Sequence, residues 1–167
     1  MKKKLIANII CLIGAFLLFL FDRLTKNIAT AALCGRDNYT LIKGVFSLSY
    51  LENNGAAWGM FGGKIDFLVI LTSVIVISIV VFMFVMPESS HFLPMRVVCG
   101  FVIAGAVGNL YDRIVLGHVV DFFYFELIDF PVFNVADCYI VCGFIAVVIL
   151  IFTLYKNDDF SLKRNSQ

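Results

Sequence analysis

The sequence is poor in charged residues and in histidine. Only 15% of its 167 residues are charged and 61% are hydrophobic, above the roughly 45 to 50% apolar usage of soluble domains. The two histidines, His91 and His118, form no His-Glu-x-x-His pattern, so the sequence offers no recognisable zinc site. The five cysteines form no Cys-x-x-Cys motif, and most fall in apolar segments. We therefore expect no cofactor, and a net charge of +1 gives no reason to expect a nucleic-acid partner.

Long apolar runs dominate the chain instead. Each is close to the roughly 20 residues that a helix needs to cross a bilayer. The sequence therefore predicts an all-α membrane protein with four transmembrane helices, forming a single domain over residues 1–167. The expected spans are about 5–26, 65–86, 92–112 and 132–155, with two loops, 27–64 and 113–131, at one face.

The first span has an alternative interpretation as a secretory signal peptide, because Lys2, Lys3 and Lys4 precede it. Its apolar run from Leu5 to Phe21 is longer than the roughly 7 to 15 residues of a signal core, and no convincing cleavage site directly follows it. A retained first helix is the better interpretation.

Charge placement gives a weak indication of orientation. With the N-terminus inside, seven basic residues face the cytoplasm and six face outward, and the lysine triplet and the basic tail favour both termini inside. Most aspartates and glutamates then lie at or beyond the outer face. We therefore expect any chemistry to take place near the extracytoplasmic face.

The first loop contains a strand pattern. Phe46, Leu48 and Tyr50 alternate with serines, which predicts a small sheet at the membrane surface, with a short helical segment beside it. Ser47 or Ser49 with Lys43 could also be imagined as a Ser/Lys protease dyad. Alternation within a strand favours the sheet.

Small residues recur along the third span. Gly100, Ala104 and Gly108 follow one another every four residues and form a smooth stripe that allows close approach of another helix. Asp112 continues this stripe and is predicted to point into the bundle. An ion pair of Asp112 with Arg113 that tethers the outer loop is the structural alternative.

Two further aspartates stand at the same predicted face. Asp121 is surrounded by apolar and aromatic residues, where desolvation would raise its pKa, although a solvated loop acid remains an alternative. Asp137 follows Asn134 by three residues, so the pair could simply cap the fourth helix. If Asp121 and Asp137 meet, they can share one proton, so that one activates water and the other protonates the carbonyl oxygen or leaving amine.

Polar residues also end the first span and follow the predicted strand. Asp22 and Lys26 are spaced i, i+4, which suits a helix-end ion pair with Lys26 reaching to the interface. Asn53 and Gly55 precede Trp58 in a stretch typical of a tight turn with a membrane anchor.

Together and in this order, these motifs resemble the lipoprotein signal peptidase family, also called signal peptidase II, over nearly the whole chain. The matching positions are Asp22, Thr25 and Lys26; Asn53, Gly55, Ala56, Ala57 and Trp58; Gly108, Asn109, Asp112 and Arg113; Asp121 within Val-Asp-Phe; and Asn134, Ala136 and Asp137 within Phe-Asn-x-Ala-Asp. Small departures occur at Arg23, Ala104 and Trp58, none of them at a catalytic position.

The resemblance implies an aspartic endopeptidase of the bacterial inner membrane with Asp121 and Asp137 as its catalytic residues. Its substrate would be a diacylglyceryl-modified prolipoprotein, cut on the N-terminal side of the lipidated cysteine, and its other partners membrane lipids. We expect a monomer. Residues expected to support the site or position the peptide are Asn53, Gly55, Asn109, Asp112, Arg113, Asn134, Asp22 and Lys26.

Two other classes of protein are alternatives. A proton-coupled transporter or channel would place acids at mid-span, yet residues 68–86, 97–108 and 138–155 contain none. A noncatalytic membrane scaffold, assembled through the small-residue stripe, is the second alternative.

Overall fold

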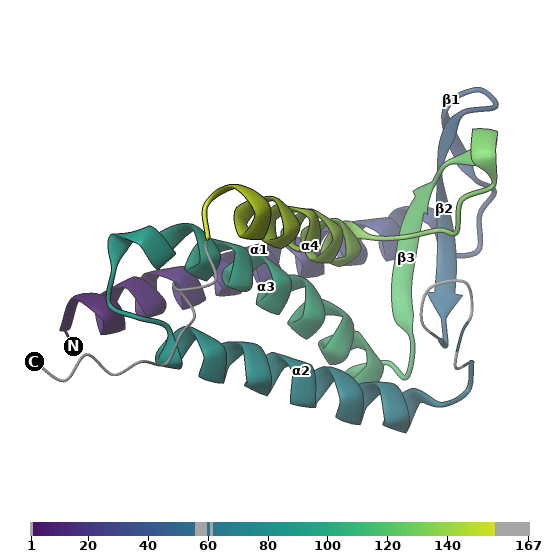
Figure 1. Cartoon of the computed structure of the whole chain (residues 1–167). Coiled ribbons are helices and arrows are strands. Elements are labelled where there is room, and N and C mark those ends of the chain that lie inside the picture. Colours follow the sequence, from purple (N-terminus) through teal and green to yellow (C-terminus); the bar gives the residue numbers. More distant parts are fainter. Residues whose placement is uncertain (1, 56–59, 61, 156–167) are drawn as a thin grey trace, which may run out of the picture.

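The computed structural model describes residues 2–55, 60 and 62–155, and Figure 1 shows a bundle of long helices with a small sheet across one end. The helices are α1 (Lys2–Leu33), α2 (Ile65–Val85), α3 (Leu93–Val115) and α4 (Val135–Thr153). The strands are β1 (Tyr39–Ile42), β2 (Phe46–Asn53) and β3 (Val119–Tyr124), and two single 3₁₀ turns are η2 (Ser90–Phe92) and η3 (Glu126–Ile128).

All four helices are long and apolar enough to cross a membrane. α3 is the most buried and packs against each of the other three, whereas α1, α2 and α4 expose large apolar side chains such as Ile70 and Phe152. An apolar surface of this extent is stable only against lipid. The predicted multi-pass membrane protein with four helices is confirmed.

Small residues allow α3 to approach two helices. A Cβ at Gly100 would lie 3.2 Å from the carbonyl oxygen of Cys11 in α1, so the predicted stripe packs closely as expected. A second contact was not predicted. A Cβ at Gly105 would overlap the carbonyl oxygen of Ala136 in α4, and one at Gly143 would lie 2.6 Å from Val102. Close packing of α3 against α4 therefore needs glycine on both helices, Gly105 on α3 and Gly143 on α4.

A buried arginine joins three helices at the end away from the sheet. Arg96 is 2% exposed, and its Nε donates a hydrogen bond to Asn8 Oδ1 at 2.8 Å. Its Nη2 donates to the carbonyl oxygen of Pro87 at 2.9 Å, while Asn8 Nδ2 donates to that of Met83 at 3.1 Å. The guanidinium thus binds the carbonyl oxygens of Met86 and Pro87, just after the C-terminal end of α2, where the helix dipole favours a cation.

The sheet is antiparallel in the order β1-β2-β3. The strand pattern of the first loop and the short helical segment are confirmed, but β3 was missed. Its first four residues are buried on both faces, so it shows no alternation of apolar and polar residues. The first helix also continues to Leu33, beyond the expected end at 26, because Ala29 and Leu33 pack against Phe122 of β3.

Candidate active site

Asp121 lies in the middle of β3 and is 1% exposed. Asn53 of β2 pairs with Val119, two residues from Asp121, so the side chains of Asn53 and Asp121 share one face of the sheet. Asn53 Nδ2 donates a hydrogen bond to Asp121 Oδ2 at 2.9 Å. The other carboxylate oxygen, Oδ1, accepts a 2.6 Å bond from Nδ2 of Asn134, which precedes α4. The second predicted loop therefore brings its aspartate against the bundle, which rules out the solvated loop acid.

Asp137 lies in the first turn of α4. The Asn134 side-chain oxygen accepts a 3.0 Å bond from the Asp137 backbone, and Asp137 Oδ2 accepts a 3.0 Å bond from the Asn134 backbone. This is the predicted capping box. The other carboxylate oxygen of Asp137, Oδ1, accepts a 2.8 Å hydrogen bond from Asn109 Nδ2 of α3. Capping the helix and taking part in the polar cluster are therefore compatible roles.

Two asparagines connect the aspartates. Asn134 Nδ2, which binds Asp121, also donates to Asn109 Oδ1 at 3.1 Å, and Asn109 in turn binds Asp137. A neutral amide offers a donor and an acceptor at fixed positions, so this chain orients both carboxylates without adding charge. The sequence alone placed the aspartates at one face and did not reveal this connection.

Burial, together with the nearby charge of Asp137, raises the pKa of Asp121 to about 7. The hydrogen bonds from Asn53 and Asn134, and the charge of Lys26, oppose that rise. The predicted upward shift is confirmed. Asp121 can therefore both hold and release a proton near neutral pH.

Lys26 lies at the centre of a charged cluster beneath this pair. Its side chain is fully buried, and Nζ lies 2.8 Å from Asn109 Oδ1, 3.0 Å from Asp22 Oδ2 and 2.9 Å from Asp112 Oδ2. The expectation that Lys26 reaches to the interface is wrong, because three oxygen partners inside the bundle offset the loss of hydration.

Asp112 points into the bundle as predicted and is fully buried, but its partner differs from the expected one. It pairs with Arg23 and Lys26 of α1 rather than with Arg113. Neighbouring residues on a helix face different directions, so Asp112 and Arg113 diverge. Arg23 also lies 4.7 Å from the centre of the Tyr111 ring.

Arg113 contacts the turn after β2. Its Nη2 donates a 2.9 Å hydrogen bond to the carbonyl oxygen of Gly55, whose own backbone N–H donates to Asn53 Oδ1 at 2.9 Å. Arg113 thereby fixes the loop that supplies Asn53 to Asp121. The matched positions Ala56, Ala57 and Trp58, with the expected membrane anchor, lie outside the described residues.

Asp22 connects α1 to α4. Its Oδ1 accepts a 3.0 Å hydrogen bond from the backbone of Ala136, next to Asp137, and a Cβ at Gly108 would lie 2.6 Å from its Oδ2. All ten predicted site residues thus belong to one connected cluster. By contrast, no hydrogen bond among the described residues joins Lys43 to Ser47 or Ser49, and the buried Ser47 Oγ has no hydrogen-bond partner.

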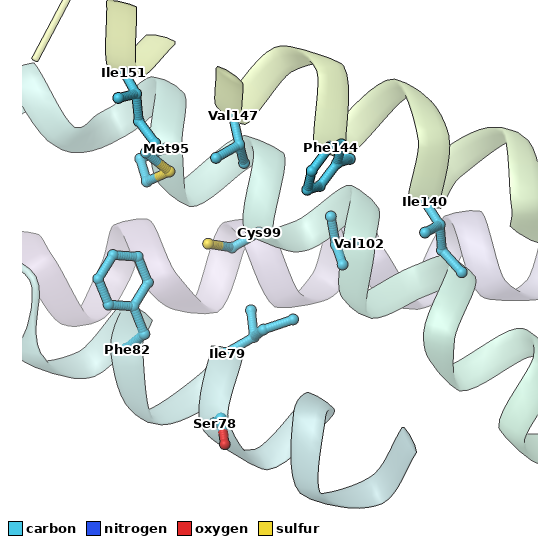
Figure 2. A pocket seen from close by; sticks show the side chains of 10 residues that line it. All are labelled: Ser78, Ile79, Phe82, Met95, Cys99, Val102, Ile140, Phe144, Val147 and Ile151. Carbon is cyan, nitrogen blue, oxygen red and sulfur yellow. The ribbon is translucent and has the colours of Figure 1, made fainter. Parts of the chain in front are cut away.

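An apolar groove of about 610 Å³ runs along the bundle between α2, α3 and α4. Figure 2 shows its lining, in which Ser78 supplies the only oxygen among ten labelled side chains. Ile140 borders it one helical turn from Asp137, and Ile151 lies toward the opposite end of α4. The groove could not be predicted from the sequence, because uniformly apolar helices give no sign of which side chains leave a space between them.

Residues 14–153 match the family model described as signal peptidase (SPase) II. The chain is 40% identical to a lipoprotein signal peptidase of Staphylococcus haemolyticus over 151 residues, 89% of this chain and 94% of the relative. It is 42% identical to one of Clostridium acetobutylicum over 142 residues, 83% and 90% of the two chains. A solved bacterial membrane enzyme, determined by the in meso method at 2.3 Å resolution, superposes with a TM-score of 0.77 at 33% identity, covering 94% of this chain and 93% of that one. This chain therefore belongs to the signal peptidase II family.

Proposed function

We propose that Asp121 and Asp137 are the catalytic pair with which this peptidase removes signal peptides from prolipoproteins. The observation that carries the proposal is their linkage through Asn134 and Asn109 in a buried site where the Asp121 pKa is about 7. Structural aspartates elsewhere in the cluster lie against cations, whereas this pair is held mainly by neutral amides.

The charges of the cluster favour a shared proton. Asp22 and Asp112 are matched by Arg23 and Lys26, which lie in direct contact with them. Arg113 is then the remaining cation that interacts with the two catalytic carboxylates. One proton held between those carboxylates leaves the buried site neutral, which is the favoured state at low dielectric.

In the reaction, the ionised carboxylate takes a proton from water while the protonated one donates its proton to the scissile carbonyl oxygen. The water oxygen bonds to the carbonyl carbon and forms a tetrahedral diol. A proton then passes from the pair to the amide nitrogen, the C–N bond breaks, and the diol returns the proton, so that one proton again lies between Asp121 and Asp137. Neither step requires a covalent intermediate with the enzyme.

The groove between α2 and α4 supports a lipid-modified substrate. An apolar signal-peptide helix fits a groove lined almost entirely by hydrocarbon, and the groove reaches within one turn of Asp137. The carbonyl groups of such a helix become accessible to water only where it unwinds. We infer that the scissile bond, before the lipidated cysteine, unwinds at the sheet end while the acyl chains stay in lipid.

We further infer that both termini are cytoplasmic and that the sheet end faces outward in the bacterial inner membrane. The lysine triplet before α1 supports this orientation. Membrane lipids and the lipid-modified prolipoprotein are the proposed partners, and a monomeric enzyme stays a prediction.

Cleavage of purified diacylglyceryl-modified prolipoprotein tests the assignment. Asp121→Asn and Asp137→Asn should each lower kcat by about 100-fold or more, the lower range for general acid–base groups. Asp129→Asn is the matched control, since Asp129 is an exposed acid at the same end of the molecule whose carboxylate accepts a hydrogen bond from Tyr124 OH, and asparagine tolerates its left-handed backbone. Full activity in Asp121→Asn would refute the proposal, and loss in Ser47→Ala with both aspartates intact would indicate serine chemistry.

A further inference from the structure

Large apolar side chains gather at the tip of the sheet, outside the helical bundle. Leu41 and Ile42 at the end of β1 are 50% and 57% exposed. Leu127 and Ile128 of η3 are each 69% exposed, more than Ile70 of α2 at 64%. In a segment surrounded by water, side chains of this size would normally be covered.

These four residues lie at one end of the sheet, two in the hairpin and two in the 3₁₀ turn, and are together called the hairpin patch. The backbone N–H of Leu127 donates a 3.4 Å hydrogen bond to the carbonyl oxygen of Val45, in the turn between β1 and β2. Beside it, the rings of Phe46 and Phe125 lie 4.8 Å apart between centres. The 3₁₀ turn is therefore fixed against the hairpin, and its two aliphatic side chains extend the apolar tip of the strands. The patch consists of Leu41, Ile42, Leu127 and Ile128.

The position of the hairpin patch suggests what covers it. The strands run across the helices, and the end that carries β1 and η3 extends well past α1 and α4 (Figure 1). Lipid must surround the exposed apolar faces of those helices, so the tip projects sideways over the same bilayer. The nearest apolar phase available to the hairpin patch is therefore the leaflet at the sheet end of the bundle.

Charges around the patch are mixed. Lys43 adjoins Ile42 in the hairpin turn, while Glu126 and Asp129 flank the apolar pair of η3. Basic side chains are therefore not in excess in the hairpin turn and η3, so these two segments give no preference for anionic headgroups. Contact with the membrane would thus depend on burial of apolar side chains, with the Lys43 ammonium reaching the headgroups.

An uncovered edge strand with apolar side chains is also a hazard. All four residues of β1 are exposed, and β1 is the edge of the sheet, where unpaired strands invite association with another chain. Burial of this tip in a leaflet removes the apolar surface from water without requiring a second protein.

We propose that the hairpin patch inserts into the leaflet at the sheet end and anchors the sheet to the membrane surface. The anchor fixes the height of β2 and β3, and with them Asn53 and Asp121, relative to the lipid. The anchor determines where the sheet lies and is separate from the proposed chemistry, so it can be tested without measuring cleavage.

Fluorescence of a single tryptophan tests the insertion. The full chain has one tryptophan, so Trp58→Phe gives a background into which Ile42→Trp or Ile128→Trp places one indole. The protein is reconstituted in phosphatidylcholine vesicles, with lipids brominated on the acyl chains near the glycerol. Interfacial residues lie about 5 to 10 Å into the headgroup and acyl boundary, so brominated lipid should quench the emission and iodide should quench it little.

Two controls define the outcome. Phe144→Trp in the same background places an indole on the exposed face of α4 and should be quenched by bromines deep in the acyl chains. Adding anionic lipid should leave the quenching at positions 42 and 128 unchanged. Quenching by iodide without quenching by brominated lipid would overturn the proposal. Protection of the indole from iodide only at a high protein-to-lipid ratio would also overturn it, because that result indicates a second copy. Protection that appears only with bound substrate would overturn it as well.

Discussion

The side chain of Asn134 contacts Asp121 and caps the helix that carries Asp137. Its Nδ2 lies 2.6 Å from Asp121 Oδ1, and its Oδ1 lies 3.0 Å from the backbone nitrogen of Asp137. One amide therefore sets the relation between a carboxylate on β3 and the first turn of α4. A change at Asn134 should separate its role in helix capping from its role in the site.

Asn134→Ser should keep the cap, since asparagine and serine cap helices about equally well. It removes the amide that donates to Asp121 without adding a charge, so kcat should fall by about 10- to 100-fold, the worth of one hydrogen bond to a charged group, while the unfolding temperature stays above that of Asn134→Ala. Asn134→Ala should lose activity and also about 1 kcal/mol of stability. Cleavage kinetics and thermal unfolding in the same detergent measure both effects. Wild-type kcat in Asn134→Ser would show that the amide donor is dispensable.

The raised pKa of Asp121 predicts a pH dependence of stability. Because the folded pKa of about 7 lies above the ordinary value of 3.8, the folded state binds the proton more tightly than the unfolded state. The resulting stabilisation is complete below about pH 4 and is lost as pH rises through 7. At about 1.4 kcal/mol per pKa unit, this loss amounts to roughly 4 kcal/mol.

Thermal unfolding at several pH values between 4 and 8 measures this slope, and Asp121→Asn should flatten it. The same deprotonation should appear in the pH profile of kcat/KM as a step near pH 7. If Asp121→Asn leaves the slope unchanged, another group accounts for it.

Lys26→Met should destabilise the fold by about 3 to 5 kcal/mol, because it leaves buried carboxylates without their cation. The double change Lys26→Met with Asp22→Asn should recover part of the loss, since Asp22 is one of the two carboxylates that contact Nζ. Chemical denaturation of both variants checks this coupling. Equal stability of the single and double variants would mean that the Asp22 contact contributes nothing.

Gly105→Ala should force α3 away from α4, because the new Cβ would overlap the carbonyl oxygen of Ala136. Overpacking of this kind costs typically about 1 to 3 kcal/mol. Gly14→Ala is the matched control on α1, where nothing lies within 4 Å of the place that the new methyl would occupy, and it should stabilise the helix by up to about 1 kcal/mol. Unfolding temperatures of the pair measure the difference, and equal values would show that α4 moves freely.

Features determined by neighbouring residues could be predicted from the sequence. Four apolar runs of bilayer length specify the helices, because each helix satisfies its own backbone hydrogen bonds in lipid. The capping box of Asn134 and Asp137 spans four residues, and the inward direction of Asp112 follows from its spacing after Gly108. The ordered motifs then distinguished Asp121 and Asp137 from the other aspartates through resemblance to a family.

Features that depend on distant residues required the tertiary structure. β3 pairs with a strand nearly seventy positions earlier in the chain, so that Asn53 meets Asp121, and Lys26 is buried only because Asn109 and Asp112 of another helix supply its partners. The sequence by itself determined which segments enter the membrane and which carboxylates stand at one end. Only the packing of the tertiary structure decided which carboxylates face a cation and which face an amide. The reason is that these contacts form where a helix face meets a strand face, and no local sequence pattern encodes that meeting.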